Sequence, residues 1–223
     1  MTDRSTAAGW VDDRATFAAA LDDLKSTGCL LLVLEAGGSD AGDDGCRRLL
    51  GDDAVDERKR LFVRSQADPD TPGPSADGSS ERTLVYQSTG RSAGAAQSAS
   101  SGSATTVVAG VDALEDAAER EIEALAPLGG YEDGQLRVCV DALGTLLEDD
   151  DLLSVLEFTK TLGDAARERS GIAHVHVDQH VAGMAVEALL PQFDAVVEVG
   201  GDEDARQRWH LPDESLSTAW LEL

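Results

Sequence analysis

Apolar runs alternate with amphipathic stretches along most of this chain. From residue 11 to residue 26, apolar side chains recur at helical spacing and acidic residues fill the opposite face, which predicts a helix. The next run, residues 29 to 36, is apolar without alternation and is bounded by glycine on both sides. Such a run is typical of a strand that is buried on both faces.

The same alternation continues toward the C-terminus. Further strands are predicted at residues 60–65, 105–110, 136–143, 172–177 and 193–201. Helices are expected at residues 111–126, with Asp112 as the N-cap, at 149–169 and at 182–190. The last strand pairs with residues 205–211 as a hairpin. This order predicts an α/β fold with a doubly wound, mostly parallel sheet, helices on both faces and a C-terminal antiparallel hairpin.

Residues 66 to 103 differ in composition from the rest of the chain. They are rich in Ser, Gly, Ala, Pro and Asp, and their only apolar island is at residues 84 to 86. A structureless loop of this length is unusual inside a compact domain. We therefore predict a single domain over residues 1–223, interrupted by a mobile insertion that contributes at most one edge strand.

Acidic residues dominate the charge of the chain. It carries 43 Asp and Glu against 18 Lys and Arg, which gives a formal net charge of -25. A basic partner or a cation store would explain such acidity, but the acids are spread through every segment, which favours adaptation to molar salt, where the repulsion is screened. We expect a haloarchaeon-like cytoplasm with high K⁺. Direct binding of DNA or RNA is not expected, because no basic stripe exists.

The sequence predicts a cytoplasmic protein without a membrane segment. The N-terminal residues lack the apolar core of a signal peptide, and no apolar run approaches 18 residues. Cys29, Cys46 and Cys139 are an odd number of cysteines without C-x-x-C spacing, so the spacing indicates neither a disulfide framework nor a zinc site. Cys29 and Cys139 lie inside apolar runs and are expected to be small core residues.

Three histidines lie close together in the sequence. His174 and His176 share one face if residues 172–177 form a strand, and His180 lies past its end, beside Asp178. A zinc site needs a third or fourth ligand, and none is identifiable from the spacing. We interpret these residues as histidines satisfied by hydrogen bonds, and we expect neither a metal nor another cofactor.

A glycine pattern follows the first predicted strand. Gly37 and Gly42 stand five residues apart, as in the phosphate-binding pattern G-x-x-x-x-G-K-[ST]. Asp43 replaces the lysine of that pattern, and Asp44 replaces its hydroxyl residue. A unit charge pair at about 4 Å and an effective dielectric constant near 20 is worth roughly 4 kcal/mol, so the replacement opposes phosphate binding. The pattern predicts a degenerate nucleotide loop without catalysis.

Asp141 ends another apolar strand, where an aspartate commonly holds magnesium-bound water in phosphate-loop enzymes. The alternative is an aspartate that caps the following turn. Together with the glycine pattern, Asp141 indicates a relic of a magnesium site. Near the C-terminus, Trp209 is expected to pack in the core, and an interaction surface that Trp209 forms with Trp220 is the alternative.

The order of these motifs resembles that of RecA/KaiC-like ATPases. The features that carry the resemblance are the glycine loop, the strand RVCVDAL before a long helix, the strand IAHVHV and the closing hairpin. More narrowly, the chain is similar to a haloarchaeal family of uncharacterised KaiC-related proteins that often lack a functional phosphate loop. The resemblance covers residues 27–65 and 105–223. It implies a RecA-like core with Asp141 at the position of the magnesium strand.

Two functions follow as expectations. The first is a non-catalytic, pseudo-ATPase regulatory module in signalling or transcription control, which binds a protein partner or itself. The second is an enzyme or sensor with an acidic pocket at the carboxyl ends of the strands. Four acids would then form a cluster for Mg²⁺ or Mn²⁺, namely Glu35, Asp43, Asp44 and Asp141.

Overall fold

The computed structural model describes residues 5–36, 41–51, 58–65, 80–88, 105–180, 183–201, 205–213 and 215–223, and for residues 5–13, 41 and 43 the backbone alone. The helices are α1 (Ser5–Thr27), α2 (Ala41–Leu50), α3 (Val111–Leu125), α4 (Leu143–Asp149), α5 (Leu152–Glu168), α6 (Met184–Leu189) and the 3-10 turn η1 (Leu190–Gln192). The strands are β1 (Cys29–Glu35), β2 (Lys59–Ser65), β3 (Glu81–Gln87), β4 (Thr105–Ala109), β5 (Leu136–Asp141), β6 (Ile172–Asp178), β7 (Ala195–Gly200), β8 (Arg206–Leu211), β9 (Leu216–Ser217) and β10 (Leu221–Glu222).

These strands form one sheet in the order β10-β8-β7-β1-β6-β5-β2-β3-β4, with β9 paired to β8. All neighbours from β7 to β4 run parallel, whereas β8 is antiparallel to β7, β9 and β10. The structure confirms the predicted α/β class, the mostly parallel sheet and the C-terminal antiparallel hairpin. β1 lies in the interior of the sheet, as its continuous apolar run predicted.

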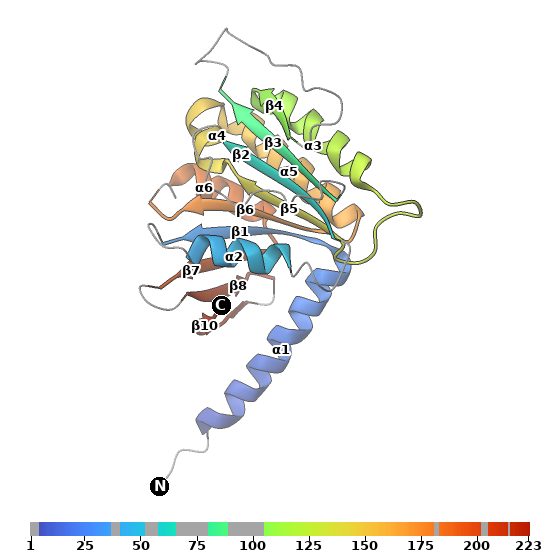
Figure 1. Ribbon diagram of the computed structural model, residues 1–223. Helices are drawn as coiled ribbons and strands as arrows, with labels where there is room; N and C mark the ends of the chain where they lie inside the picture. Colours follow the sequence, from blue (N-terminus) through green and yellow to red (C-terminus); the bar gives the residue numbers. More distant parts are fainter. Residues whose placement is uncertain are drawn as a thin grey trace.

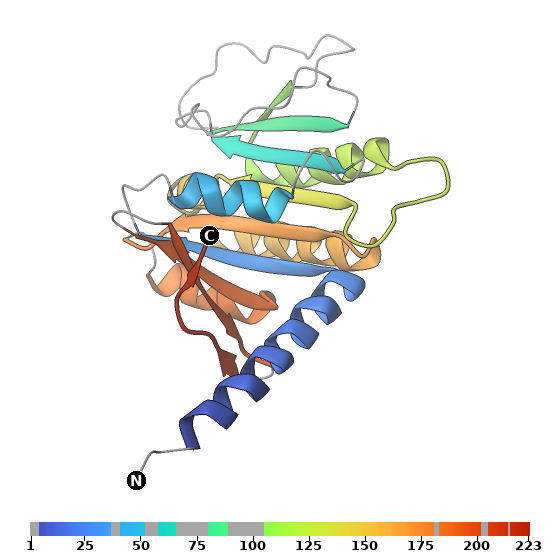
Figure 2. The same ribbon diagram turned by 60° about the horizontal axis from the view of Figure 1, so that its bottom comes forward.

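Helices cover both faces of the sheet (Figures 1 and 2). Leu30 and Leu32 of β1 point into the larger core, which the sheet shares with α3, α4, α5 and α6. Cys29, Leu31 and Val33 alternate with them and belong to a second core on the opposite face, beneath α1. α2 lies on the same face as α1 and packs over β5 and β7. The alternation within β1 therefore supplies both cores at once.

α1 packs on the sheet through its C-terminal half. Phe17 meets Trp209 of β8 edge to face, with ring centroids 6.0 Å apart, and Ala20 is buried beside them. This contact confirms the predicted packing role of Trp209. The N-terminal half of α1 extends beyond the sheet (Figure 2). No helix in the described residues is long and apolar enough to cross a membrane.

The structure corrects two local predictions. The glycine-rich stretch after β1 is helical from Ala41 onward, so the second half of the predicted loop lies in α2. The N-cap of α3 is Gly110 rather than Asp112, which lies in the first turn of that helix. Gly110 has φ 82° and ψ 154°, a conformation that glycine adopts readily and aspartate does not.

The stretch predicted as an insertion contains an internal strand. Residues 81 to 87 form β3, which lies between β2 and β4 and is therefore not an edge strand. Leu84 and Tyr86 are buried against α3, and Glu81 forms a buried ion pair with Arg60 of β2 at 3.1 Å. Because Arg60 pairs with the charge of Glu81, this acidic residue can be buried inside the sheet. The remainder of the predicted insertion, residues 66–79 and 89–103, lies outside the described residues.

Candidate functional site

Four potential metal ligands meet beneath α2. They are Cys46, Cys139, His174 and His176, and one ligand atom from each lies within 4.8 Å of the others. The Sγ atoms of Cys46 and Cys139 are 3.2 Å apart, and Sγ of Cys46 is 3.6 Å from Nε2 of His174. All four side chains are buried, with exposed fractions between 0% and 4%. We call this group the Cys₂His₂ cluster.

The register of the sheet explains how the cluster forms. His174 and His176 are two residues apart in β6, so their side chains point to the same face. Cys139 of β5 pairs directly with His174 and therefore points to that face as well. Cys46 comes from α2, which covers this part of the sheet. The three elements are distant in the sequence. α2 and β5 each contribute one ligand, and β6 contributes two.

The spacing of the cluster is close to that of a tetrahedral zinc site. Zinc binds thiolate sulfur at about 2.3 Å and imidazole nitrogen at about 2.0–2.1 Å. A tetrahedron with these bonds places two sulfurs about 3.8 Å apart, and sulfur and nitrogen about 3.6 Å apart. The corresponding separations in the cluster are 3.2 Å and 3.6 Å. These two separations are within about 0.6 Å of the tetrahedral values, and all four ligand atoms lie within 4.8 Å of one another.

Glu35 orients one of the two histidines. Nδ1 of His176 donates a hydrogen bond of 2.5 Å to Oε1 of Glu35, at the end of the neighbouring strand β1. This bond leaves Nε2 of His176 as the ligand atom. Metal-binding histidines usually donate their second nitrogen to a carboxylate in this way. Glu35 therefore occupies the position that the outer carboxylate partner of a metal-bound histidine would take.

His174 and His176 are each hydrogen-bonded through only one of their two ring nitrogens. Nε2 of His176 and Nδ1 of His174 are buried and have no hydrogen-bond partner. This finding corrects the prediction of core histidines whose hydrogen bonds are all formed. An unpaired buried nitrogen is costly, and such groups in native proteins call for a functional explanation. Coordination of a metal would supply such an explanation for Nε2 of His176.

The electrostatics of the cluster favour a thiolate on one cysteine. The hydrogen bond from Cys139 lowers the pKa of Cys46 far below its usual range, with further lowering by His174 and His176. The same hydrogen bond, together with burial, raises the pKa of Cys139. Burial lowers the pKa of His174. Burial also opposes charge on His176, but the proximity of Cys46 and the hydrogen bond to Glu35 outweigh burial and raise its pKa.

Gly42, Asp43 and Asp44 of the predicted nucleotide loop lie in the first turn of α2. A side-chain carbon at Gly42 would lie only 2.7 Å from the Glu35 carboxylate, so the two are in close contact. Asp44 forms an ion pair with Arg47 at 2.5 Å. Gly37 lies outside the described residues, as does the side chain of Asp43. Thus the carboxylate of Glu35 fills the space beside Gly42.

Asp141 stands at the end of β5, where the sequence predicted a strand-end aspartate. The predicted convergence of Glu35, Asp44 and Asp141 on a metal site is not found. In the described part of the chain, the group of converging ligand atoms contains two cysteines and two histidines instead. Glu35 is not one of these ligands. It contacts the group only through its hydrogen bond with Nδ1 of His176, the ring nitrogen that is not a ligand atom.

Sequence reasoning missed this cluster because its ligands are far apart in the chain. The available signal was an H-x-H pair inside an apolar strand, combined with a cysteine inside another such strand. Its partner Cys46 was visible only as an isolated residue after a glycine-rich stretch. His180, the third histidine considered, lies outside the cluster, and its backbone N–H is bonded to Asp178.

Comparison with known proteins yields a family but no activity. Residues 28–199 match a family of unknown function, DUF7504. No curated protein matches the chain. One solved structure with a similar fold is "Structural study of Project ID PH0250 from Pyrococcus horikoshii OT3", at 11% identity and a TM-score of 0.55, covering 88% of this chain and 95% of that chain. At this identity the likeness concerns the fold alone.

Proposed function

This chain belongs to the DUF7504 family of unknown function, so its role must be inferred from its own site, and we propose that it is a non-catalytic metal-binding protein. Cys46, Cys139, His174 and His176 are the ligands, and Glu35 is the residue that positions His176. The observation that carries the proposal is the convergence of four buried ligand atoms within 4.8 Å of one another.

Zn²⁺ is the metal that best matches these ligands. Two sulfur and two nitrogen donors in a tetrahedral arrangement are typical of structural zinc sites. Catalytic zinc sites keep one position open for water or substrate, whereas here four protein side chains complete the coordination. The near-complete burial of all four argues for the same conclusion. A structural role of the metal follows.

The metal would fix α2 on the sheet. The apolar contact between α2 and β2 and β5 is small: Cys46 and Leu50 meet Phe62 and Cys139. Two of these four residues are ligands, and the helix also contacts the second core through Leu49 and β7 through Gly45, which faces Val199. Burial of one large aliphatic side chain contributes about 1.5–3 kcal/mol. Metal coordination would therefore add to the attachment of α2.

A zinc titration tests this proposal. Protein freed of metal with a chelator in molar KCl is titrated with Zn²⁺ against a chromophoric competitor. We expect one zinc ion to bind per chain. Loss of an outer partner weakens metal binding by up to about 100-fold, and loss of a ligand should cost more, so His174→Ala should weaken zinc binding by more than about 100-fold. His180→Ala is the matched control and should leave the affinity unchanged. Absence of zinc binding, or equal losses in the two variants, would contradict the proposal.

The arrangement of β1 and β5 favours a second, compatible role: a RecA/KaiC-like pseudo-ATPase module. Both strands end at the same edge of the sheet with β6 between them, so Gly42 and Asp141 lie at the edge where open α/β sheets bind ligands. Asp44 and the Glu35 carboxylate make this edge acidic, which opposes phosphate binding. We propose regulation through a protein partner or self-association in a haloarchaeal cytoplasm.

Calorimetry and light scattering test the second role. Titration with ATP and Mg²⁺ in molar KCl should give no binding heat. Light scattering should detect self-association, or a pull-down in the same buffer should recover a partner. Micromolar binding of ATP would contradict the proposal that the loop containing Gly42, Asp43 and Asp44 does not bind nucleotides. A monomer that recovers no partner would overturn the regulatory role while leaving the metal site untouched.

A further inference from the structure

The two cysteines of the Cys₂His₂ cluster are close enough to react with each other. Their Sγ atoms are 3.2 Å apart. A tetrahedral zinc ion would hold the two sulfurs about 3.8 Å apart, whereas a disulfide bond would bring them to about 2.05 Å. The observed distance lies between these two values. The two states exclude each other, because the sulfurs of a disulfide are no longer thiolates and the thiolate is the form that binds metals.

The position of α2 determines how an oxidant reaches this pair. Cys46 and Cys139 are both buried where α2 packs on the sheet. Cys139 lies in β5, an interior strand, whereas Cys46 belongs to a ten-residue helix on the outside of the sheet (Figure 1). Peripheral elements with few apolar contacts open locally at a lower free energy than core strands. Local opening of α2 therefore exposes Cys46 first, and a small oxidant such as hydrogen peroxide then reaches its sulfur.

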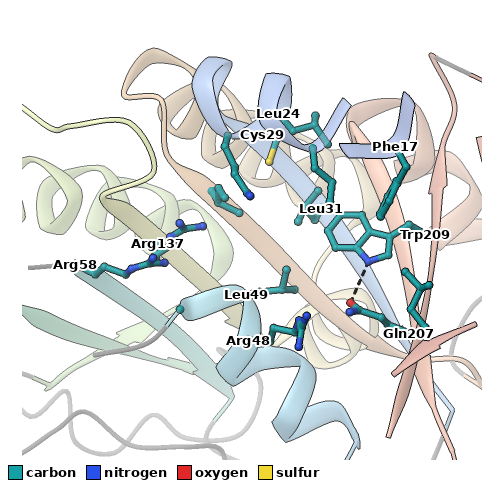
Figure 3. Close-up of a pocket in the computed structure, with 15 residues that line it drawn as sticks. Phe17, Leu24, Cys29, Leu31, Arg48, Leu49, Arg58, Arg137, Gln207 and Trp209 are labelled. Carbon is teal, nitrogen blue, oxygen red and sulfur yellow. Dashed lines mark hydrogen bonds between the residues drawn. The ribbon is translucent and has the colours of Figure 1, made fainter. Parts of the chain in front are cut away.

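Cys29 serves as an internal comparison, because it is buried like the pair but lies apart from it. It lines a cavity of about 360 Å³ between α1 and α2, together with Leu24 and Leu31 (Figure 3). β6 separates the strand of Cys29 from the strand of Cys139. Two strand spacings are about 9.6 Å, beyond the limit of about 7 Å between the Cα atoms of a disulfide. If access alone governed oxidation, Cys29 would react as readily as the pair.

We propose that Cys46 and Cys139 are a site of reversible oxidation, at which a peroxide converts the two metal ligands into a disulfide bond. The disulfide competes with the metal for the same two sulfur atoms. Oxidation therefore releases the metal, and a bound metal protects the cysteines from oxidation. The competition rests on the metal site proposed above, whereas formation of the disulfide rests on the 3.2 Å separation of the sulfurs.

The reaction proceeds in two steps with hydrogen peroxide as the oxidant. In the first, the Cys46 thiolate attacks one peroxide oxygen, the O–O bond breaks, hydroxide leaves and Cys46 becomes a sulfenic acid. In the second, the sulfur of Cys139 attacks the sulfur of Cys46, so that the S–S bond forms and the S–O bond breaks. The departing hydroxide takes the thiol proton of Cys139 and leaves as water. Each sulfur loses one electron, and the two peroxide oxygens gain these two electrons.

Peroxide treatment of the full chain tests the proposal. Metal-free and zinc-loaded protein are treated with a small excess of hydrogen peroxide in molar KCl, and the remaining thiols are counted after denaturation. In the metal-free protein the count should fall from three to one, and peptide mapping without reduction should find Cys46 linked to Cys139. At a free zinc concentration about 100 times Kd, only about 1% of the chains are metal-free, so the linkage should form about 100-fold more slowly. The oxidised chain should bind zinc again only after reduction with dithiothreitol.

Two variants separate the pair from general oxidation. Cys29→Ser should form the linkage at the rate of the parent, whereas Cys139→Ser should form no internal disulfide and should accumulate a sulfenic acid at Cys46, detected by labelling with dimedone. A thiol count that stays at three, a linkage that forms no faster than the Cys29 thiol is lost, or zinc binding by the oxidised chain would each overturn the inference. A metal-free chain that does not bind zinc before oxidation would contradict the proposed metal site itself. Zinc binding before oxidation, without the linkage afterwards, would overturn this inference alone.

Discussion

Substitution of Glu35 tests whether the Cys₂His₂ cluster is built as a metal centre. Glu35 accepts the Nδ1 hydrogen bond of His176 at 2.5 Å, and Glu35→Ala removes that acceptor while all four ligands remain. Loss of such an outer partner typically weakens metal binding by about 10- to 100-fold. The Glu35 side chain is 32% exposed, so solvent screens part of its charge. We therefore expect the lower value, about tenfold or 1.4 kcal/mol.

The assay is a competition titration of Zn²⁺ against a chromophoric chelator. Glu198→Ala is a matched control, because Glu198 also accepts a 2.5 Å hydrogen bond from a histidine, His210, away from the cluster. Glu35→Gln separates charge from hydrogen bonding and should recover part of the loss, because its amide oxygen still accepts the bond. An unchanged zinc affinity in Glu35→Ala, or an equal loss in Glu198→Ala, would refute the positioning role of Glu35.

Three further predictions follow from the cluster and from the fold. In differential scanning calorimetry, Cys46→Ser and Cys139→Ser should abolish the zinc-dependent rise in Tm, whereas Cys29→Ser should keep it. In the parent chain, a free zinc concentration 1,000 times Kd stabilises the fold by about 4 kcal/mol, which corresponds to a rise in Tm of about 8–16 °C. Zinc affinity should increase with pH by up to about 100-fold per unit near neutral pH, because binding displaces one thiol proton and one imidazolium proton whose pKa values are raised; a flat profile in competition titrations would contradict this. Gly28→Ala should destabilise the fold by about 2–3 kcal/mol in urea unfolding, because the added carbon would lie 2.6 Å from a backbone oxygen at φ +77°. Gly129→Ala, with positive φ but no atom within 4 Å, should cost only about 1 kcal/mol, and equal losses would contradict the steric explanation.

The fold class was predictable because the periodicity of the chain is strong. The continuous apolar run of β1 and the alternation of strands with helices led directly to a mostly parallel sheet. β3 was harder to predict, because Glu81 and Thr83 of this strand are polar and yet buried. Only the pairing of Glu81 with Arg60 of another strand makes that burial acceptable. Such a partner cannot be deduced from local periodicity.

The candidate site was predictable only in part. The shared face of His174 and His176 follows from the twofold periodicity of a strand, and the structure confirms it. Cys139 joins them through the register of β5 against β6, and Cys46 through the position of α2. Both depend on tertiary arrangement rather than on spacing along the chain. The acids singled out at the strand ends were correct in position, but they do not gather into a ligand group among the described residues.

X-ray absorption at the zinc edge tests the central claim most directly. The sample is the purified chain loaded with one equivalent of Zn²⁺ in molar KCl. The proposed site predicts a first shell of two sulfur atoms at about 2.3 Å and two nitrogen atoms at about 2.0–2.1 Å. In Cys139→Ser the two-sulfur first shell should be absent. A first shell made only of oxygen and nitrogen atoms would contradict a metal centre at Cys46, Cys139, His174 and His176.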